Sequence, residues 1–253
     1  MSAVTPSPQV VAPEDPPFLP LPGGTGRLRM PFPIETGPRN LVHRILAFEP
    51  GERADFGDER SEDVLYVASG RGRAAIGDRD VVIEPGSALL APPALPYSIE
   101  GRGADPLVLV SVVAPPRWAE GAPSPIAVTV DLERVHVHER DQPELPAGTD
   151  RFFKLLIDPA RGCRFMTQFV GFIRRGSAPF HVHRYEECIH VLEGEGRVHI
   201  EDRAEPVAAG WSVYLPPGTP HRIENASDGL LKLLGVFSPA GSPADRMDDI
   251  ARP

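Results

Sequence analysis

The chain has 253 residues, of which 41% are hydrophobic, enough to bury one large core or two smaller ones but not three. Acidic residues outnumber basic residues 35 to 26, and the net charge of −9 argues against binding to nucleic-acid phosphates, which needs a basic surface. The longest apolar run, residues 107–114, is far too short to cross a bilayer, and the first residues show no secretory signal. Two cysteines cannot form a disulfide framework, so we expect a cytoplasmic protein that binds neither nucleic acid nor membrane.

Residues 1–26 are rich in proline, glycine and small polar residues, a composition that predicts a flexible N-terminal arm. The rest of the chain consists of short apolar and β-branched runs separated by turn residues, with almost no helical periodicity. The clearest runs are LVHRILAF (41–48), DVLYVAS (63–69), DVVI (80–83), LVLVSVV (107–113), RFFKLLI (151–157), FMTQFVGFI (165–173), ECIHVLE (187–193) and LKLLGVF (231–237). They predict an all-β sandwich or barrel. One short helix is expected near the C-terminus, at residues 242–250, where Ser242 can cap the first turn.

The chain also repeats itself with an offset of 124 residues. Without any gap, fourteen positions between residues 62 and 100 are identical to the positions 124 residues later, beginning with Glu62 and Glu186. Self-similarity of this extent indicates a tandem duplication of one β-module. The expected segments, in chain order, are the arm (1–26), the first module (27–114), a proline-rich linker (115–150) and the second module with the short C-terminal helix (151–253).

Three histidines and one glutamate of the second module have the spacing of a metal site. His181 and His183 are two residues apart, so on an extended strand their imidazoles face the same side, and Glu187 keeps that phase. His221 belongs to a later strand that can close against the first. Three imidazoles and a carboxylate suit one divalent first-row metal per chain, with Fe or Mn favoured and Ni, Zn or Co as alternatives.

The two stretches that carry these residues, GSAPFHVHRYEECIHVLEG and GWSVYLPPGTPHRIEN, resemble the two signature motifs of the cupin superfamily. The second stretch matches that motif at every defined position. The first matches at His-x-His, at Glu187 and at Gly194, but has four residues instead of five between Gly176 and His181. The resemblance covers the second module and, through the repeat, the first. It implies two tandem double-stranded β-helix (jelly-roll) barrels, with a metal at the mouth of the second.

The first module has lost the ligand residues. In the repeat register the four ligand positions are occupied by Gly57, Glu59, Asp63 and Tyr97. Because two carboxylates without an imidazole make a poor transition-metal site, we expect the first barrel to be a structural or substrate-shaping partner, with the Tyr97 ring filling the old ligand cavity. A degenerate first half and a metal-binding second half also resemble the architecture of the ureidoglycine aminohydrolase family.

The resemblance implies a metal-dependent enzyme that acts on a small organic substrate, and a dioxygenase-type oxidoreductase is the leading hypothesis. The alternatives are a non-redox enzyme, either an isomerase or a hydrolase like ureidoglycine aminohydrolase, and a non-catalytic bicupin that binds or senses a small ligand. Tyr185 shares the phase of the ligands and is a candidate proton donor, with packing as its alternative role. The edge strands that a cupin exposes predict a homodimer.

Overall fold

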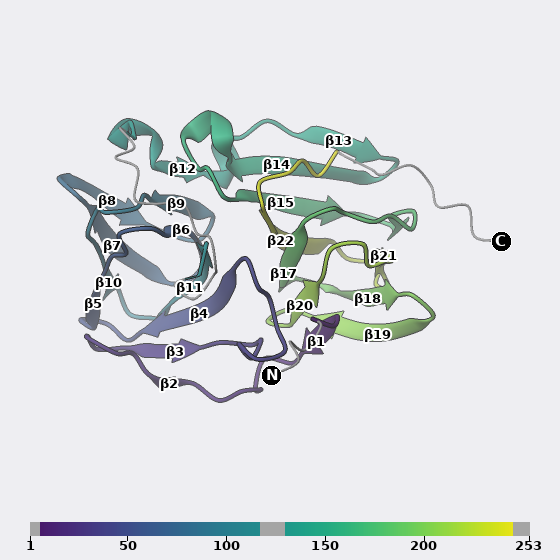
Figure 1. Ribbon diagram of the computed structural model, residues 1–253, viewed down its shortest axis with the longest axis horizontal. Coiled ribbons are helices and arrows are strands. Elements are labelled where there is room, and N and C mark those ends of the chain that lie inside the picture. The colour runs from purple at the N-terminus through teal and green to yellow at the C-terminus, as the bar shows by residue number, and fades with distance from the viewer. Residues whose placement is uncertain (1–5, 117–129, 245–253) are drawn as a thin grey trace.

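Two β-barrels lie side by side in the computed structural model, which describes residues 6–116 and 130–244 (Figure 1). Each barrel combines a seven-stranded and a four-stranded sheet, and all of the strand pairs are antiparallel. The predicted all-β fold of two tandem jelly-roll barrels is therefore confirmed. The described helices are the short 3₁₀ turns η1 (Leu132–Arg134), η2 (Glu139–Asp141) and η3 (Pro159–Arg161).

The strands of the two barrels follow one another in the same order. The first barrel contains β2 (Leu19–Pro20), β3 (Arg27–Arg29), β4 (Val42–Phe48), β5 (Arg53–Phe56), β6 (Glu62–Ser69), β7 (Arg71–Ile76), β8 (Arg79–Ile83), β9 (Ser87–Ala91), β10 (Tyr97–Arg102), β11 (Leu107–Ala114) and β12 (His136–His138). The second contains β1 (Gln9–Val11), β13 (Leu145–Gly148), β14 (Arg151–Ile157), β15 (Thr167–Ile173), β16 (Gly176–Ser177), β17 (Glu186–Glu193), β18 (Glu195–Ile200), β19 (Arg203–Ala208), β20 (Ser212–Leu215), β21 (His221–Asn225) and β22 (Leu231–Ser238).

The burial of each strand follows its place in the barrel. In β7 and β18, which are equivalent in the repeat, buried and solvent-facing residues alternate, because each belongs to a four-stranded sheet with one face in water. In β6 and β17 nearly every residue is buried, because one face lines the barrel and the other packs between the barrels. The largest hydrophobic cluster accordingly joins residues of both halves, such as Val64 and Val236.

The barrels exchange edge strands. The N-terminal β1 pairs with β20 of the second barrel, and β12, from the segment between the modules, pairs with β9 of the first (Figure 1). Strands β2 and β13 also lie within the expected arm and linker. Each of these two segments therefore contributes two short sheet strands, whereas the composition predicted a flexible arm and a linker. An edge strand offers unpaired backbone groups that such a segment can satisfy, and composition does not show this.

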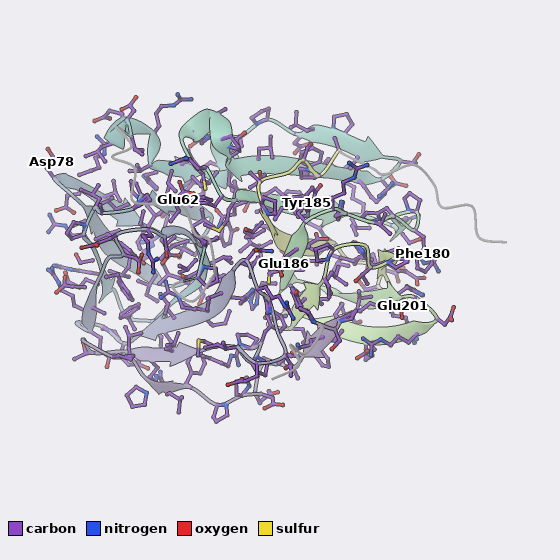
Figure 2. All side chains as sticks on the ribbon, in the orientation of Figure 1. Glu62, Asp78, Phe180, Tyr185, Glu186 and Glu201 are labelled. Carbon is purple, nitrogen blue, oxygen red and sulfur yellow. The ribbon has the colours of Figure 1, made fainter. Side chains whose placement is uncertain are left out.

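Two equivalent glutamates connect the barrels reciprocally (Figure 2). Glu62 of the first barrel accepts hydrogen bonds from the backbone N–H groups of Arg164 and Phe165, each at 2.9 Å. Glu186 of the second barrel accepts the N–H groups of Arg39 and Asn40, each at 2.8 Å. Burial raises the pKa of both carboxyl groups. Their identity in the repeat therefore reflects one contact that is used twice across a pseudo-twofold interface.

Glycine is required where the strands β6 and β17 turn into the next strand. Gly70 and Gly194 have φ angles of 75° and 83°, in the left-handed region that favours glycine. A Cβ atom at Gly70 would lie 2.2 Å from the carbonyl oxygen of Pro106, and one at Gly194 would lie 2.2 Å from that of Leu230. The repeat conserves these two residues because the same close turn is built in both barrels.

No helix in the described part of the chain is long and apolar enough to cross a membrane. The expected C-terminal helix lies mostly outside the described residues, although the Ser242 hydroxyl does accept the N–H of Ala244 at 3.1 Å. The expected homodimer stays a prediction.

Candidate metal centre

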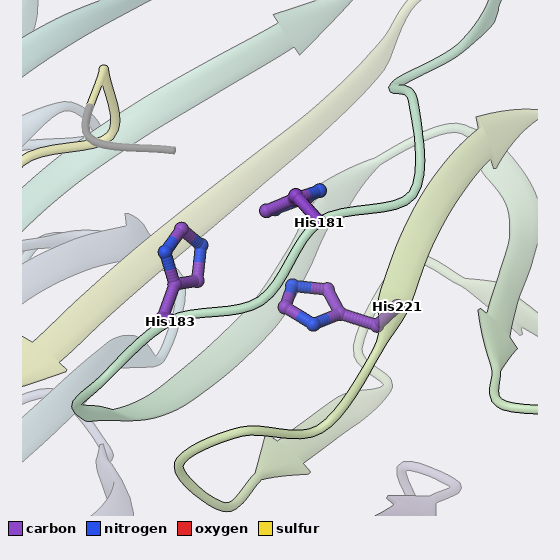
Figure 3. A group of neighbouring side chains, drawn as sticks. All are labelled: His181, His183 and His221. Carbon is purple, nitrogen blue, oxygen red and sulfur yellow. The ribbon is translucent and has the colours of Figure 1, made fainter. Parts of the chain in front are cut away.

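Three histidines converge at one end of the second barrel (Figure 3). His181 and His183 lie on the segment that leads into β17, and His221 is the first residue of β21. The backbones of His181 and His221 form an isolated antiparallel bridge with two N–H···O bonds of 3.0 Å. One ligand atom from each of the three imidazoles lies within 4.8 Å of the others. A single bridge, and not the expected continuous strand, therefore brings the histidines together.

The loop before β21 holds His221 against the other two histidines. Gly218 has a φ angle of 78°, and its N–H donates to the carbonyl oxygen of His183 at 2.8 Å. Glycine adopts this left-handed conformation without a steric penalty, so the turn can close tightly. The glycine of the second motif thus ties the two ligand-bearing loops to each other.

The tautomers of two imidazoles are set by backbone carbonyl groups. Nδ1 of His181 lies 3.0 Å from the carbonyl oxygen of Pro179, and Nδ1 of His221 lies 2.9 Å from that of Thr219. Because a carbonyl oxygen only accepts hydrogen bonds, each Nδ1 carries the proton and each Nε2 keeps a free lone pair. This arrangement is typical of metal-binding histidines.

The carboxylate of Glu187 completes the cluster. Its Oε2 atom lies 3.2 Å from Nε2 of His221 and 3.7 Å from Nε2 of His183. Glu187 is only 5% exposed, and its Oε2 atom forms no hydrogen bond of good geometry with any described residue. A buried carboxylate oxygen without a hydrogen bond is costly, and a cation would relieve that cost. The residues present therefore fit a divalent metal, as the spacing predicted.

The protonation states favour a cation as well. Burial, together with the charge that His221 can carry, lowers the pKa of His181 to about 4, so this imidazole is neutral near pH 7. Burial alone would raise the pKa of Glu187, but the adjacent His221 and His183 outweigh burial and lower it. At neutral pH the cluster therefore presents a free imidazole lone pair beside a negative carboxylate.

Aromatic side chains surround the cluster on its inner side. The ring of Phe237 lies 4.9 Å from that of His183, and Phe169 lies 4.9 Å from Phe237. This contact places Phe169, and with it Thr167 two residues earlier, on the inner face of β15. Phe165, which precedes β15, packs in the core that joins the two barrels.

Tyr185, the candidate proton donor, has two contacts that support packing. Its ring stacks on that of His183 at 4.9 Å, and its hydroxyl donates to the carbonyl oxygen of Ser242 at 2.9 Å. The C-terminal segment therefore covers Tyr185, and Gly241 is required there because a Cβ atom would lie 2.2 Å from the ring.

Two segments of the chain, residues 44–113 and 169–237, match the family of cupin domains, and together they make up more than half of its length. The chain belongs to the cupin family. Since one match falls in each barrel, the protein is a bicupin, as the resemblance of the second module and the internal repeat predicted.

Sequence relatives match only part of this bicupin. A stretch of 60 residues is 38% identical to an uncharacterized protein of Methanocaldococcus jannaschii, and one of 75 residues is 29% identical to an uncharacterized protein of Aquifex aeolicus. These stretches cover 24% and 30% of this chain, and 48% and 61% of the two relatives. The chain thus matches about half to three-fifths of their length.

Solved structures show the same two-barrel fold over nearly the whole chain. Protein YlbA from E. coli superposes with a TM-score of 0.74 at 14% identity, covering 97% of this chain and 96% of its own. Oxalate decarboxylase from Bacillus subtilis, whose Mn(II) centres have been studied, superposes with a TM-score of 0.71 at 15% identity, covering 92% and 78%. At such low identity the likeness establishes the fold alone.

The first cupin barrel contains a cavity at the place of the lost ligands. Its volume is about 980 Å³, and Gly57, Glu59, Asp63 and Tyr97 all line it. Tyr97 is buried and stacks on Phe56 at 5.0 Å, but open space remains beside the ring. The expectation that Tyr97 fills the old cavity is therefore wrong, because the ring is buried against Phe56 and leaves an open volume that it lines.

Strand pairing changes one of the repeat equivalences. Tyr97 lies opposite Phe56, whereas its counterpart His221 lies opposite His181. By pairing, Phe56 and not Gly57 therefore takes the place of His181, and the gapless register is off by one residue in this loop. The conclusion is unaffected, because neither residue can bind a metal.

The cavity of the first barrel ends at a polar network that was not foreseen from the sequence. Asp63 forms an ion pair with Arg44 and accepts hydrogen bonds from Tyr97 and, at 2.7 Å, from Ser111. Nε and Nη2 of Arg44 also donate to the Ser111 hydroxyl, at 3.1 and 2.8 Å. Arg44 stands inside a mostly apolar strand, and this was the available signal. Its partner 19 residues away was not apparent from spacing.

The remaining histidine pair, His136 and His138, has no metal-site geometry. Both residues lie on β12 and are half-buried, and Nδ1 of His138 accepts the backbone N–H of Arg140 at 3.1 Å. The pair repeats the His-x-His spacing at the edge of the first barrel, away from the converging histidines of the second.

Proposed function

We propose that this bicupin is a metal-dependent enzyme that acts on a small organic substrate through one divalent metal in its second barrel. His181, His183, His221 and Glu187 would hold the ion. One observation carries the proposal: three imidazoles converge, and two of them lie within 3.7 Å of a buried Glu187 oxygen that has no hydrogen bond of good geometry from any described residue. Such a cluster is costly as it stands and is relieved by a cation.

The bound metal would supply a Lewis acid for a substrate oxygen or nitrogen and, as Fe or Mn, a redox-active centre for dioxygen. The protein residues prepare that site. The carbonyl oxygens of Pro179 and Thr219 fix the tautomers of His181 and His221. The rings of Phe169 and Phe237 form an apolar wall that excludes water from the inner side. Access is easiest beside His181, which is the most exposed of the three histidines.

Dioxygenase-type oxidation is the reaction class that we favour, with Fe or Mn as the metal. Three histidines and one carboxylate leave coordination positions for both substrate and dioxygen on a metal that accepts six ligands. The structural likeness to a decarboxylase with Mn(II) centres supports manganese. The apolar wall suits an organic substrate that chelates through oxygen atoms, such as a diketone or a flavonol.

The proposal is tested by metal analysis followed by turnover measurements. Purified protein is first assayed for bound Fe, Mn, Ni, Zn and Co. Oxygen uptake and product formation are then measured with diketones, flavonols and ureido compounds, for the parent and for Glu187→Gln. We expect oxygen uptake with at least one chelating substrate, and its loss in the variant. Product without oxygen uptake would overturn the dioxygenase assignment in favour of an isomerase or hydrolase, and binding without turnover would indicate a non-catalytic module.

A further inference from the structure

The first barrel keeps a cavity large enough for a small molecule although it lacks metal ligands. Its volume of about 980 Å³ falls in the range of small-molecule sites. The walls are mainly apolar, with Met30, Val42, Phe56, Leu95 and Val113 among them. Apolar walls favour an apolar occupant, because the water that contacts them is released when such a molecule binds.

The inner end of the cavity is already organised for hydrogen bonding. Asp63, Tyr97 and Ser111 are nearly fully buried and are joined to Arg44 through the network described above. The guanidinium has five N–H groups; its hydrogen bonds to Asp63 and Ser111 use three of them, and the Tyr97 hydroxyl accepts another. The Arg44 side chain lines the cavity and keeps 18% of its surface exposed. One N–H donor is therefore left for an oxygen acceptor that enters from the cavity.

The charges around the cavity select against an anion. Four carboxylates line it, those of Asp55, Asp58, Glu59 and Asp63, against two guanidinium groups. An anion would therefore meet a net negative lining. A cation would find Asp63 already neutralised by Arg44, Asp55 already paired with Arg53, and Asp58 already bonded to backbone N–H groups. An uncharged molecule incurs neither cost and gains the apolar walls.

We propose that the first cupin barrel is a metal-independent binding site for an uncharged, mainly apolar organic molecule with a carbonyl or other oxygen acceptor. The acceptor meets the Arg44 end of the cavity, and the apolar body lies against Val42, Phe56 and Val113. This site is separate from the metal cluster of the second barrel and does not depend on the enzymatic function proposed for it.

The test uses Prodan, an uncharged naphthalene ketone whose emission shifts to the blue in an apolar site. Titration of the full-length protein should show saturable binding of one Prodan per chain. Binding should be unchanged by EDTA and in His183→Ala, because the metal cluster belongs to the other barrel. The uncharged ketone 2-acetonaphthone should displace Prodan at a concentration at least about tenfold lower than the anion 2-naphthoate, because the carboxylate would be repelled by the net negative lining of the cavity.

A cavity-filling variant locates the site. Val113→Phe introduces the residue that the second barrel has at the equivalent position, Phe237, and should weaken Prodan binding at least about tenfold by occupying the space. Val82→Phe makes the same substitution at a position of the first barrel that is 75% exposed and should leave binding unchanged. Should Val113→Phe fail to fold, Ile34→Trp at the exposed rim serves in its place, with energy transfer from the new tryptophan to Prodan as the readout.

Three results would overturn the proposal. They are absence of saturable binding, loss of binding in His183→Ala or with EDTA, and equal binding by Val113→Phe and the parent. In the tryptophan variant, energy transfer no stronger than in the parent would have the same meaning. Preferential displacement by 2-naphthoate would contradict the ligand class.

Discussion

The two barrels of this bicupin have one scaffold but neutralise their buried carboxylate in different ways. Asp63 of the first barrel and Glu187 of the second occupy the same repeat position. Asp63 is paired with a cation of the chain itself, Arg44, whereas Glu187 faces imidazoles. Arg44 thus provides in the first barrel the positive charge that a metal would provide in the second. The comparison shows that one copy of a duplicated site pairs its buried carboxylate with a cation of the chain itself, whereas the other copy is suited to a metal ion.

The two barrels also differ in a pair of residues that face each other on neighbouring strands. In the ladder between β4 and β11, Arg44 lies opposite Ser111, and in the equivalent ladder of the second barrel Phe169 lies opposite Gly235. Gly235 makes room for the ring, because a Cβ atom would lie 2.2 Å from Phe169. In the first barrel the Ser111 hydroxyl instead accepts hydrogen bonds from Arg44. Loss of the ring also helps to explain why the cavity lies in the first barrel.

Removal of a histidine ligand should have the largest effect. We expect His221→Ala to lose its metal and to reduce turnover at least about 10³-fold, because the proposed metal would act as the Lewis acid of the reaction. The barrel should still fold, since its core is apolar on both sides of the site. Metal content, turnover and circular dichroism check this, with His199→Ala in the same barrel as the control. An unfolded His221→Ala would show that the site is structural.

Asp63 should matter for stability and not for metal content. Asp63→Asn leaves the Arg44 charge without its carboxylate in a mostly buried place, and should lower the free energy of unfolding by about 2–4 kcal/mol. Urea unfolding measures this. Glu59→Gln, an exposed change in the lining of the same cavity, should stay within about 0.5 kcal/mol of the parent. Loss of the bound metal from Asp63→Asn would contradict the assignment of the two halves.

Moving the internal cation into the second barrel should displace the metal. In the double variant Phe169→Arg/Gly235→Ser, the guanidinium would neutralise Glu187 as Arg44 neutralises Asp63, and metal affinity should fall at least about tenfold. Phe169→Met/Gly235→Ser removes the same ring without adding charge and is the matched control. Calorimetric titration with Mn(II) compares the two variants. Equal affinities would mean that charge does not distinguish the barrels.

The smallest effect is expected from the hydroxyl of Tyr97. Tyr97→Phe removes one hydrogen bond to Asp63 but keeps the ring stacked on Phe56, and should cost about 1 kcal/mol of stability. Turnover should stay within a few-fold of the parent, because the residue does not touch the metal cluster. Intact stability with lost turnover would instead place the working site in the first barrel.

Much of the fold and of the metal cluster could be predicted because the relevant signals are local or repeated. Short apolar runs identified the strands, and the 124-residue offset identified two modules. The spacing of His181, His183 and Glu187, together with the motif around His221, pointed to the residues that the structure places within a few ångströms of one another.

The features that escaped prediction depend on contacts between distant segments. Nothing in the composition of residues 1–26 shows that β1 pairs with the second barrel, because that pairing depends on a free edge at β20. The ion pair of Arg44 and Asp63 depends on the register of β4 and β6, which pair with opposite edges of β11. The cavity beside Tyr97 remains because the ring packs against Phe56, and the sequence alone shows only that a large aromatic ring occupies this position.

Counting bound ions shows whether each chain holds one metal and whether that metal lies in the second barrel. The protein is saturated with Mn(II), desalted and analysed by inductively coupled plasma mass spectrometry, in parallel with His221→Ala and Asp63→Asn. We expect one ion per chain for the parent and for Asp63→Asn, and none for His221→Ala. Two ions per chain in the parent, or one ion retained by His221→Ala, would contradict it.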